Sequence, residues 1–271
     1  MSALRKILFR LGLLAALAYL AVMVLLVTQE TRLIFAAGQQ LGKTRPSIPW
    51  QEAGSVPGWV VPAAKSDSSP WVIYFHGKGA DIASGGNIHH YEQLRGLGLN
   101  VLAPEYTGFG GVIGEPSEAG LNADAMRAYL YLRNQRHIEP KNIVLYGWSL
   151  GSAVAVTLAS KVEKAAVILE GAPASVAAIG QHRYPVFPVR LLIHNPFESI
   201  ERIGRIGAPV LFLHSPEDQT VPISEARRLF EAAPQPRHFV EVAGGHNNAS
   251  RTDPHFFPAI HSFLRDLQLL P

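Results

Sequence analysis

One stretch of the chain decides the fold: Val144-Leu145-Tyr146-Gly147-Trp148-Ser149-Leu150-Gly151-Ser152-Ala153. Apolar residues suited to a strand come first, the pattern G-x-S-x-G follows, and small residues suited to the start of a helix come last. A strand that turns directly into a helix strains the serine, and side chains at Gly147 and Gly151 would collide with neighbouring backbone. The stretch therefore predicts Ser149 as a nucleophile above a sheet edge, at a helix N-terminus whose dipole favours a developing negative charge.

Short apolar runs alternate with helical patterns along most of the chain. The runs are continuously apolar, as is typical of strands that are buried on both faces. Strands that alternate with helices of this length form βαβ units, so we expect an α/β fold with a mostly parallel central sheet and helices on both faces. The predicted strands are 71–75, 100–103, 142–146, 165–169, 209–213 and 238–242, and the predicted helices are 88–97, 117–136, 150–162, 224–232 and 254–269.

A serine nucleophile needs a base and an acid that orients the base. In a fold of this kind the acid and then the histidine follow the serine along the chain, each just beyond a strand. Asp218 follows one of the later predicted strands, and His246 lies in a glycine-flanked turn after the last one. Glu217 is an alternative acid, although Asp218 has the better setting, D-x-x-V-P. We therefore expect Ser149, Asp218 and His246 to be the catalytic residues.

An oxyanion formed at Ser149 would need two backbone N–H groups to stabilise it. One is expected from Leu150, the residue after the nucleophile, and the other from the loop after an early strand. Lys78 is the candidate in that loop, because it lies in Phe75-His76-Gly77-Lys78-Gly79, where the glycines allow close approach of the backbone. The Lys78 side chain is interpreted as a solvated surface lysine rather than as a contact for an acidic substrate.

Composition and charge exclude several classes of function. The 271 residues carry 24 Lys+Arg against 21 Asp+Glu, and the net charge of +3 is not gathered into a basic run, so no nucleic-acid partner is expected. The chain has no cysteine, which excludes disulfides, thiolate nucleophiles and cysteine-bound metals. His89-His90 lacks an accompanying carboxylate cluster and is interpreted as a pair on a helix face. We expect neither a metal nor an organic cofactor.

An apolar segment over residues 7–27 opens the chain, with Arg10 as its only charge. Together with its apolar flanks it is long enough to span a hydrocarbon core of roughly 30 Å. A signal peptide is the alternative, but its apolar core would be shorter and would end at a small-x-small cleavage site, which residues 28–32 do not offer. We therefore expect an uncleaved membrane anchor over residues 1–30 and a catalytic domain over residues 31–271.

The basic residues around this segment bear on its orientation. Arg5, Lys6 and Arg10 precede the uninterrupted part of the apolar run, which predicts a cytoplasmic N-terminus and a catalytic domain on the opposite side of the membrane. Basic residues at positions 32, 43 and 45 follow the run and oppose this orientation.

Several stretches form a specific combination: Phe75–Ala80, Glu105–Gly110, Gly114–Ser117, Gly147–Gly151, Tyr184–Arg190, Asp218–Pro222 and Gly245-His246. From about Thr31 onward the chain resembles the membrane-anchored serine hydrolases with an α/β-hydrolase domain, which have one N-terminal anchor and no large cap domain. It departs from them at Glu105-Tyr106-Thr107-Gly108, a supporting loop where the family has Asp-Tyr-Arg-Gly. It also departs at Gly171-Ala172-Pro173, near the expected substrate entrance, where the family has an Asn-Thr-Phe-like stretch.

The resemblance implies the α/β-hydrolase fold and a serine hydrolase that acts on carboxylic esters or thioesters. Ser149 would attack the carbonyl, His246 would take the proton, Asp218 would hold the imidazolium, and water would resolve the acyl-enzyme. Residues 171–195 are expected to form a short lid over an apolar pocket, or else to pack ordinarily against the sheet. An anchor beside such a pocket suggests a lipid-like or acylated small-molecule substrate. The alternatives are a serine peptidase and a non-catalytic scaffold, although a scaffold would be expected to lose triad members that this chain retains.

Overall fold

The structure, a computed structural model, describes residues 3–38, 42–64 and 69–271. These residues form a sheet with the strand order β1-β2-β4-β3-β5-β6-β7-β8. The neighbours from β4 to β8 are parallel, whereas β1 and β2 pair antiparallel at one edge. The strands are β1 (Gln51–Glu52), β2 (Gly58–Val61), β3 (Trp71–Phe75), β4 (Asn100–Pro104), β5 (Ile143–Trp148), β6 (Ala166–Glu170), β7 (Val210–His214) and β8 (Arg237–Glu241).

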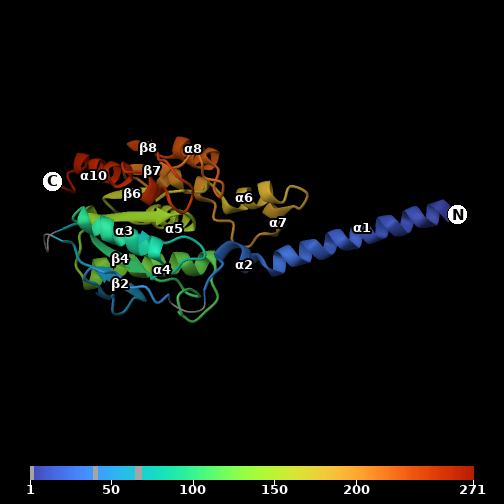
Figure 1. The fold of residues 1–271 in the computed structure, drawn as a ribbon, viewed down its shortest axis with the longest axis horizontal. Helices are drawn as coiled ribbons and strands as arrows, with labels where there is room; N and C mark the ends of the chain where they lie inside the picture. The colour runs from blue at the N-terminus through green and yellow to red at the C-terminus, as the bar shows by residue number, and fades with distance from the viewer. Residues whose placement is uncertain (1–2, 39–41, 65–68) are drawn as a thin grey trace.

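Helices cover both faces of the sheet, and each face encloses an apolar core (Figure 1). Side chains of α4, α5 and α8 enter one core, and those of α3 and α10 enter the other. Successive residues of a buried strand alternate between the two cores, so Ile73 and Phe75 enter the first and Val72 and Tyr74 the second. The α-helices are α1 (Ala3–Thr28), α2 (Glu30–Phe35), α3 (Gly85–Gly96), α4 (Glu118–Leu130), α5 (Leu150–Ala159), α6 (Val176–Arg183), α7 (Val189–Leu192), α8 (Ile223–Ala232), α9 (Ala249–Thr252) and α10 (Phe256–Asp266).

The predicted α/β fold with a mostly parallel sheet is confirmed, and all six predicted strands begin and end within two residues of an observed strand. The long helix predicted over 117–136 is α-helical only to Leu130, and Tyr131–Gln135 forms a π-helical turn. The edge strands β1 and β2 are absent from the prediction. They are short, and they lie in a stretch punctuated by proline and glycine, whose residues weaken any strand pattern.

The first helix projects from the body of the protein as one extended rod (Figure 1). α1 has 26 residues, none of them buried, and it is long and apolar enough to cross a membrane. The short helix α2 follows directly and returns the chain to the body. There the Phe35 ring is fully buried and meets the edges of Phe109 and Phe197 at centroid distances of 6.4 and 6.0 Å. Phe35 therefore fixes the point at which α2 joins the core.

Replacing Phe35 with alanine should destabilise the protein by about 3–5 kcal/mol, because the substitution leaves a cavity between two other aromatic rings. Phe35→Leu retains most of the apolar volume and should cost less. Urea unfolding of the two variants and the wild type in the same detergent measures the difference. An unfolding free energy for Phe35→Ala equal to that of the wild type would show that α2 does not contribute to the core.

Candidate active site

Ser149 lies at the sharp turn between β5 and α5, as predicted. Its φ and ψ are 54° and −119°, a strained backbone conformation for a residue other than glycine. The Ser149 N–H donates to the carbonyl of Glu170 at the end of β6, at 2.8 Å. The turn therefore remains attached to the neighbouring strand while it presents the hydroxyl beyond the edge of the sheet.

The two glycines of the predicted turn are required because neighbouring backbone atoms occupy the space that a Cβ would need. A Cβ on Gly151 would overlap the carbonyl oxygens of Phe75 and His76, and a Cβ on Gly147 would overlap the backbone of Gly151 and Ser152. Backbone atoms of the sheet have little freedom to shift, so α5 can begin this close to β3 only where these side chains are absent.

The three residues that the sequence predicts to act together form one hydrogen-bonded chain. The Ser149 hydroxyl lies 2.8 Å from His246 Nε2, and His246 Nδ1 lies 2.6 Å from Asp218 Oδ2. Asp218 follows β7 and His246 follows β8, so parallel strands bring residues 97 positions apart to one edge of the sheet. Glu217, the alternative acid, is exposed to solvent and makes no side-chain contact with His246 among the hydrogen bonds of the described residues.

The surroundings of Asp218 favour its ionised form. Its Oδ1 accepts hydrogen bonds from the N–H groups of Thr220 and Val221, at 2.8 and 2.9 Å. Burial by itself would raise the pKa of Asp218, but the His246 imidazole and these two N–H groups outweigh it and hold the pKa below the ordinary value of 3.8. Burial lowers the pKa of the adjacent His214, whose Nε2 donates to the Val221 carbonyl at 2.8 Å.

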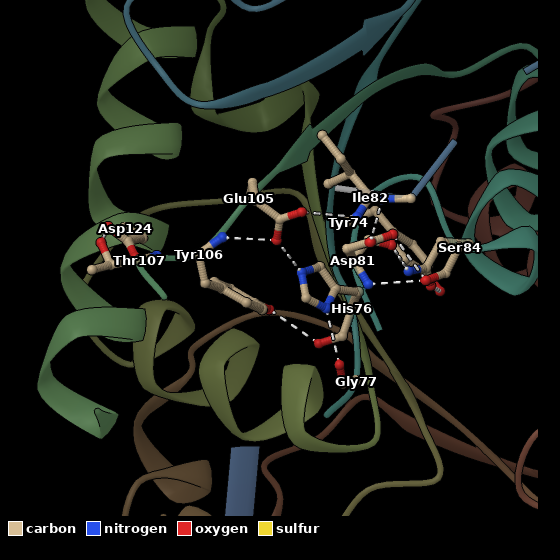
Figure 2. Close-up of polar contacts among 12 residues, drawn as sticks. Tyr74, His76, Gly77, Asp81, Ile82, Ser84, Glu105, Tyr106, Thr107 and Asp124 are labelled. Atoms are coloured by element: carbon tan, nitrogen blue, oxygen red, sulfur yellow. Dashed lines mark hydrogen bonds and ion pairs between the residues drawn. The ribbon is translucent and has the colours of Figure 1, made fainter. Parts of the chain in front are cut away.

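The loop that carries Lys78 is held in place by a buried glutamate (Figure 2). Glu105 Oε1 lies 2.8 Å from His76 Nε2, and Glu105 Oε2 accepts the N–H of Ile82 at 3.0 Å. The Tyr106 hydroxyl donates to the His76 carbonyl at 3.2 Å. The Glu105-Tyr106 stretch, where the resemblance places a supporting loop, thus fixes the segment in front of Ser149.

A second buried carboxylate, Glu170, is absent from the sequence prediction. Its Oε2 accepts a hydrogen bond from the Tyr146 hydroxyl at 2.6 Å and one from His90 Nε2 at 2.9 Å. Burial disfavours a charge on His90, but Glu170 outweighs this effect and raises the pKa of His90. The His90 ring also stacks on Trp148, the residue before Ser149. In the sequence, Glu170 is noticeable only as a charged residue at the end of an apolar run. This pattern does not show which side chains Glu170 contacts.

These contacts correct the interpretation of His89-His90 as a pair on a helix face, because His90 is buried in the core beside Glu170. His89 lies closer to the surface and faces the Ser250 carbonyl at 3.3 Å. Within the ranges that the structure describes, no group of three or more His, Cys, Asp or Glu side chains is arranged to hold a metal ion.

A pocket of about 650 Å³ opens above Ser149. Ser149, His246, Gly77, Lys78 and Leu150 are among the residues that line it, and most of the other lining residues are apolar. We call it the Ser149 pocket. Two parts of the chain supply its walls: α1 and α2, through Leu26, Val27, Glu30, Leu33 and Ile34, and residues 173–193, through Pro173, Val176, Ile179, Gly180, Arg183, Tyr184, Phe187, Val189, Leu192 and Ile193.

Comparison with known sequences assigns the chain to a family. The sequence profile of the Alpha/beta hydrolase family matches residues 56–239, which are more than half of the chain. The chain belongs to the alpha/beta hydrolase family. The resemblance noted in the sequence is thereby confirmed at the level of the family.

Individual proteins are similar to this alpha/beta hydrolase in sequence or in fold. An uncharacterized protein of Mycobacterium tuberculosis is 38% identical over 222 residues, which cover 81% of this chain and 78% of that protein. Alpha/beta hydrolase domain-containing protein 17B of Homo sapiens is 32% identical over 180 residues, which cover 65% of this chain and 60% of that protein. An esterase of Pyrococcus furiosus has a TM-score of 0.70 at 18% identity, covering 85% of this chain and 97% of that one, which shows the common fold.

Removal of Glu105 should destabilise this alpha/beta hydrolase. Glu105→Ala leaves His76 and the Ile82 N–H buried without their acceptor, and breaking a buried pair in this way costs about 3–5 kcal/mol. Glu105→Gln retains the size and one acceptor oxygen and should cost less. Urea unfolding of both variants tests this order. Equal stability of Glu105→Ala and the wild type would contradict the supporting role of the carboxylate.

Asp218 should cause a pH dependence of stability with a defined sign. Because its pKa in the folded protein is lower than the ordinary 3.8, the ionised form stabilises the fold above that pH, and this contribution is lost as the pH falls through the lowered value. The unfolding free energy of the wild type should therefore fall more steeply in acid than that of Asp218→Asn, which has no carboxylate to protonate. Urea unfolding in a series of buffers from neutral pH downward measures both slopes, and parallel curves would contradict the prediction.

Proposed function

We propose that this protein is a serine hydrolase that cleaves carboxylic ester or thioester bonds through an acyl-enzyme. The observation that carries the proposal is the chain of short contacts from Ser149 through His246 to Asp218 at the base of an apolar pocket. In this scheme Ser149 is the nucleophile, His246 is the general base and then the general acid, and Asp218 orients the imidazole. The reaction needs no cofactor.

The acylation step follows from these positions. His246 Nε2 takes the Ser149 proton as Oγ attacks the substrate carbonyl carbon, and the carbonyl π electrons move to its oxygen. The tetrahedral intermediate then collapses, the bond to the alcohol or thiol breaks, and His246 returns the proton to that leaving group. Water repeats the sequence on the acyl-enzyme and releases the acid. Asp218 remains ionised throughout, which agrees with its lowered pKa.

We assign the oxyanion contacts to the N–H groups of Lys78 and Leu150. Both residues line the Ser149 pocket beside the nucleophile, and Leu150 begins α5, where backbone N–H groups point out of the helix. The N–H of Gly79 already donates to the Phe35 carbonyl at 2.8 Å, which supports its neighbour Lys78 as the donor from this loop. The Lys78 ammonium donates to the Leu33 carbonyl at 3.3 Å and so points toward α2.

We also propose that residues 1–30 are an uncleaved membrane anchor, spanning the bilayer over residues 7–27, with a cytoplasmic N-terminus and the hydrolase domain of residues 31–271 on the opposite side. The length of α1, about 39 Å at 1.5 Å per residue, exceeds the hydrocarbon thickness. Leu26 and Val27 line the Ser149 pocket, so cleavage at the end of α1 would remove part of the wall. This contact supports an anchor over a signal peptide.

A lipid-like or acylated substrate fits this arrangement. The walls of the Ser149 pocket are mostly apolar, and part of them comes from the membrane anchor itself. An acyl chain would bury its methylenes against these walls, at about 0.8 kcal/mol for each buried methylene, while its carbonyl lay between Ser149 and the oxyanion donors. Likeness in fold to an esterase of Pyrococcus furiosus agrees with ester hydrolysis.

A fluorophosphonate probe tests the nucleophile. The wild type should be labelled, and Ser149→Ala should lose the label together with turnover of a soluble ester, by about 10⁴-fold or more. Ser160→Ala, at the C-terminal end of the same helix, is the matched control and should keep both. Asp218→Asn should retain the fold but lose about 10⁴-fold in kcat, because it orients the wrong imidazole tautomer.

The three outcomes of this experiment are distinct. Loss of label in Ser149→Ala alone supports the proposal. Equal labelling of the wild type and Ser149→Ala would place the nucleophile on another residue. A folded wild type that is neither labelled nor active would favour a non-catalytic scaffold. Turnover of esters of increasing acyl length then measures the reach of the Ser149 pocket.

A further inference from the structure

The segment with α6 and α7, residues 176–193, contacts α1 well inside the apolar helix. The Tyr19 hydroxyl donates to the Val186 carbonyl at 3.0 Å, and the Tyr19 ring stacks on Phe187 with a centroid distance of 4.9 Å. Tyr19 precedes the end of α1 at Thr28 by nine residues, which is about 13 Å along the helix axis. The α6–α7 segment therefore lies along the part of α1 that the anchor proposal places in the membrane, and Figure 1 shows it projecting from the sheet on the side where α1 leaves.

Exposed apolar side chains and positive charge occur together on this segment. Val186 is 72% exposed and Leu191 is 86% exposed, although both are large apolar residues. No acidic residue occurs between Glu170 and Glu198, whereas Arg183 and Arg190 lie beside the apolar positions. Apolar side chains flanked by arginine, without acidic residues, are the composition of a surface that enters the boundary between lipid headgroups and acyl chains.

A buried carboxylate joins the segment to the anchor. Glu30, two residues after the end of α1, accepts hydrogen bonds from the backbone N–H groups of His194 and Asn195, at 2.9 and 2.8 Å. It also accepts from His194 Nδ1 and Asn195 Nδ2, both at 2.8 Å. Burial would raise the pKa of Glu30, but these four donors outweigh it and lower the pKa. These contacts hold the chain directly after the α6–α7 segment against the start of α2, close to the end of α1.

We propose that the α6–α7 segment inserts into the same membrane leaflet that α1 enters, and that the Ser149 pocket receives an acyl chain directly from that leaflet through the gap between the two. The inference rests on the proposed function, and it names the source of the substrate as the bilayer. Leu26 and Leu33 on one wall and Phe187 and Leu192 on the other line the pocket and continue the apolar surface from the membrane to Ser149. An acyl chain that follows this route meets mostly apolar walls until its carbonyl reaches Ser149, although Glu30 and Arg183 also line the pocket.

Fluorescence quenching by lipids tests the insertion without any need for activity. The chain has no cysteine, so Leu191→Cys can be labelled at one site with an environment-sensitive fluorophore in the full-length protein. Ile113→Cys is the matched control, because Ile113 is 97% exposed in the loop between β4 and α4. In vesicles of phosphatidylcholine and phosphatidylglycerol, lipids brominated on the acyl chain should quench the label at Leu191 severalfold more than the label at Ile113. Equal quenching at both positions, or none at Leu191, would overturn the insertion.

Turnover by the reconstituted protein tests the entry route. Leu191→Glu should lower hydrolysis of a long-chain ester embedded in the vesicles by about tenfold, because it places a charge at the membrane contact. Hydrolysis of a short soluble ester and fluorophosphonate labelling should stay at wild-type levels, since Leu191 does not line the Ser149 pocket. Ile113→Glu should leave all three measurements unchanged.

The outcomes separate this inference from the proposed function. A wild type without labelling and without turnover of the short ester would defeat the proposed function, while the quenching result would still decide whether the segment inserts. An active enzyme whose Leu191→Glu variant hydrolyses the embedded ester as fast as the wild type would overturn the entry route alone. Quenching at Leu191 together with a selective loss on the embedded ester would support both.

Discussion

The close approach of α5 to β3 is the contact on which the geometry around Ser149 depends. Gly151 lies against the carbonyl oxygens of Phe75 and His76, where a Cβ would overlap both. This contact places the start of α5 beside the loop that carries Gly77 and Lys78, and it forces Ser149 into the positive-φ conformation that presents its hydroxyl. The strain is local, whereas the two-sided apolar cores that hold β3 and α5 are extensive, so the fold can maintain it.

Three buried glutamates then attach the surrounding segments to this frame. Glu105 holds the loop after β3, Glu170 ties β6 to β5 and α3 through Tyr146 and His90, and Glu30 ties the start of α2 to the chain after α7. Each accepts several hydrogen bonds, which is what makes a buried carboxylate tolerable. A charge buried in this way specifies one geometry, because moving the segment leaves the carboxylate without its donors. The positions around Ser149 are in this sense set by polar contacts within an apolar body.

The Ser149 pocket is a composite of parts that are distant in sequence. Its base comes from the ends of parallel strands, one wall comes from α1 and α2, and the other comes from residues 173–193. This explains why residues 171–195 fit no regular pattern: some of their apolar side chains pack against the core, others line the pocket or contact the first helix, and Val186 and Leu191 are exposed. The pocket also connects α1 with the rest of the protein. This helix is apolar enough to cross a membrane, and its last residues line the Ser149 pocket.

The amino-acid sequence by itself determined the parts that depend on local pattern and chain order. Continuous apolar runs located the parallel strands, the glycines around Ser149 located the sharp turn, and the order of Asp218 and His246 after later strands brought them to the same sheet edge. The apolar run over residues 7–27 likewise predicted a helix long enough to cross a membrane. Each of these follows from neighbours in sequence or from the geometry that parallel strands share.

Only the tertiary structure decided which distant groups meet. The edge pair β1 and β2, the contact of His90 with Glu170, and the clamp between Glu30 and His194, 164 residues apart, leave no periodic signal in the sequence. The sequence does not distinguish a buried glutamate from an exposed one. The hydrogen-bond donors that make burial of the carboxylate possible come from distant parts of the chain, and packing of the whole molecule brings them together. For the same reason the walls of the Ser149 pocket cannot be predicted from the sequence, because they form only where α1 and residues 173–193 lie side by side in the fold.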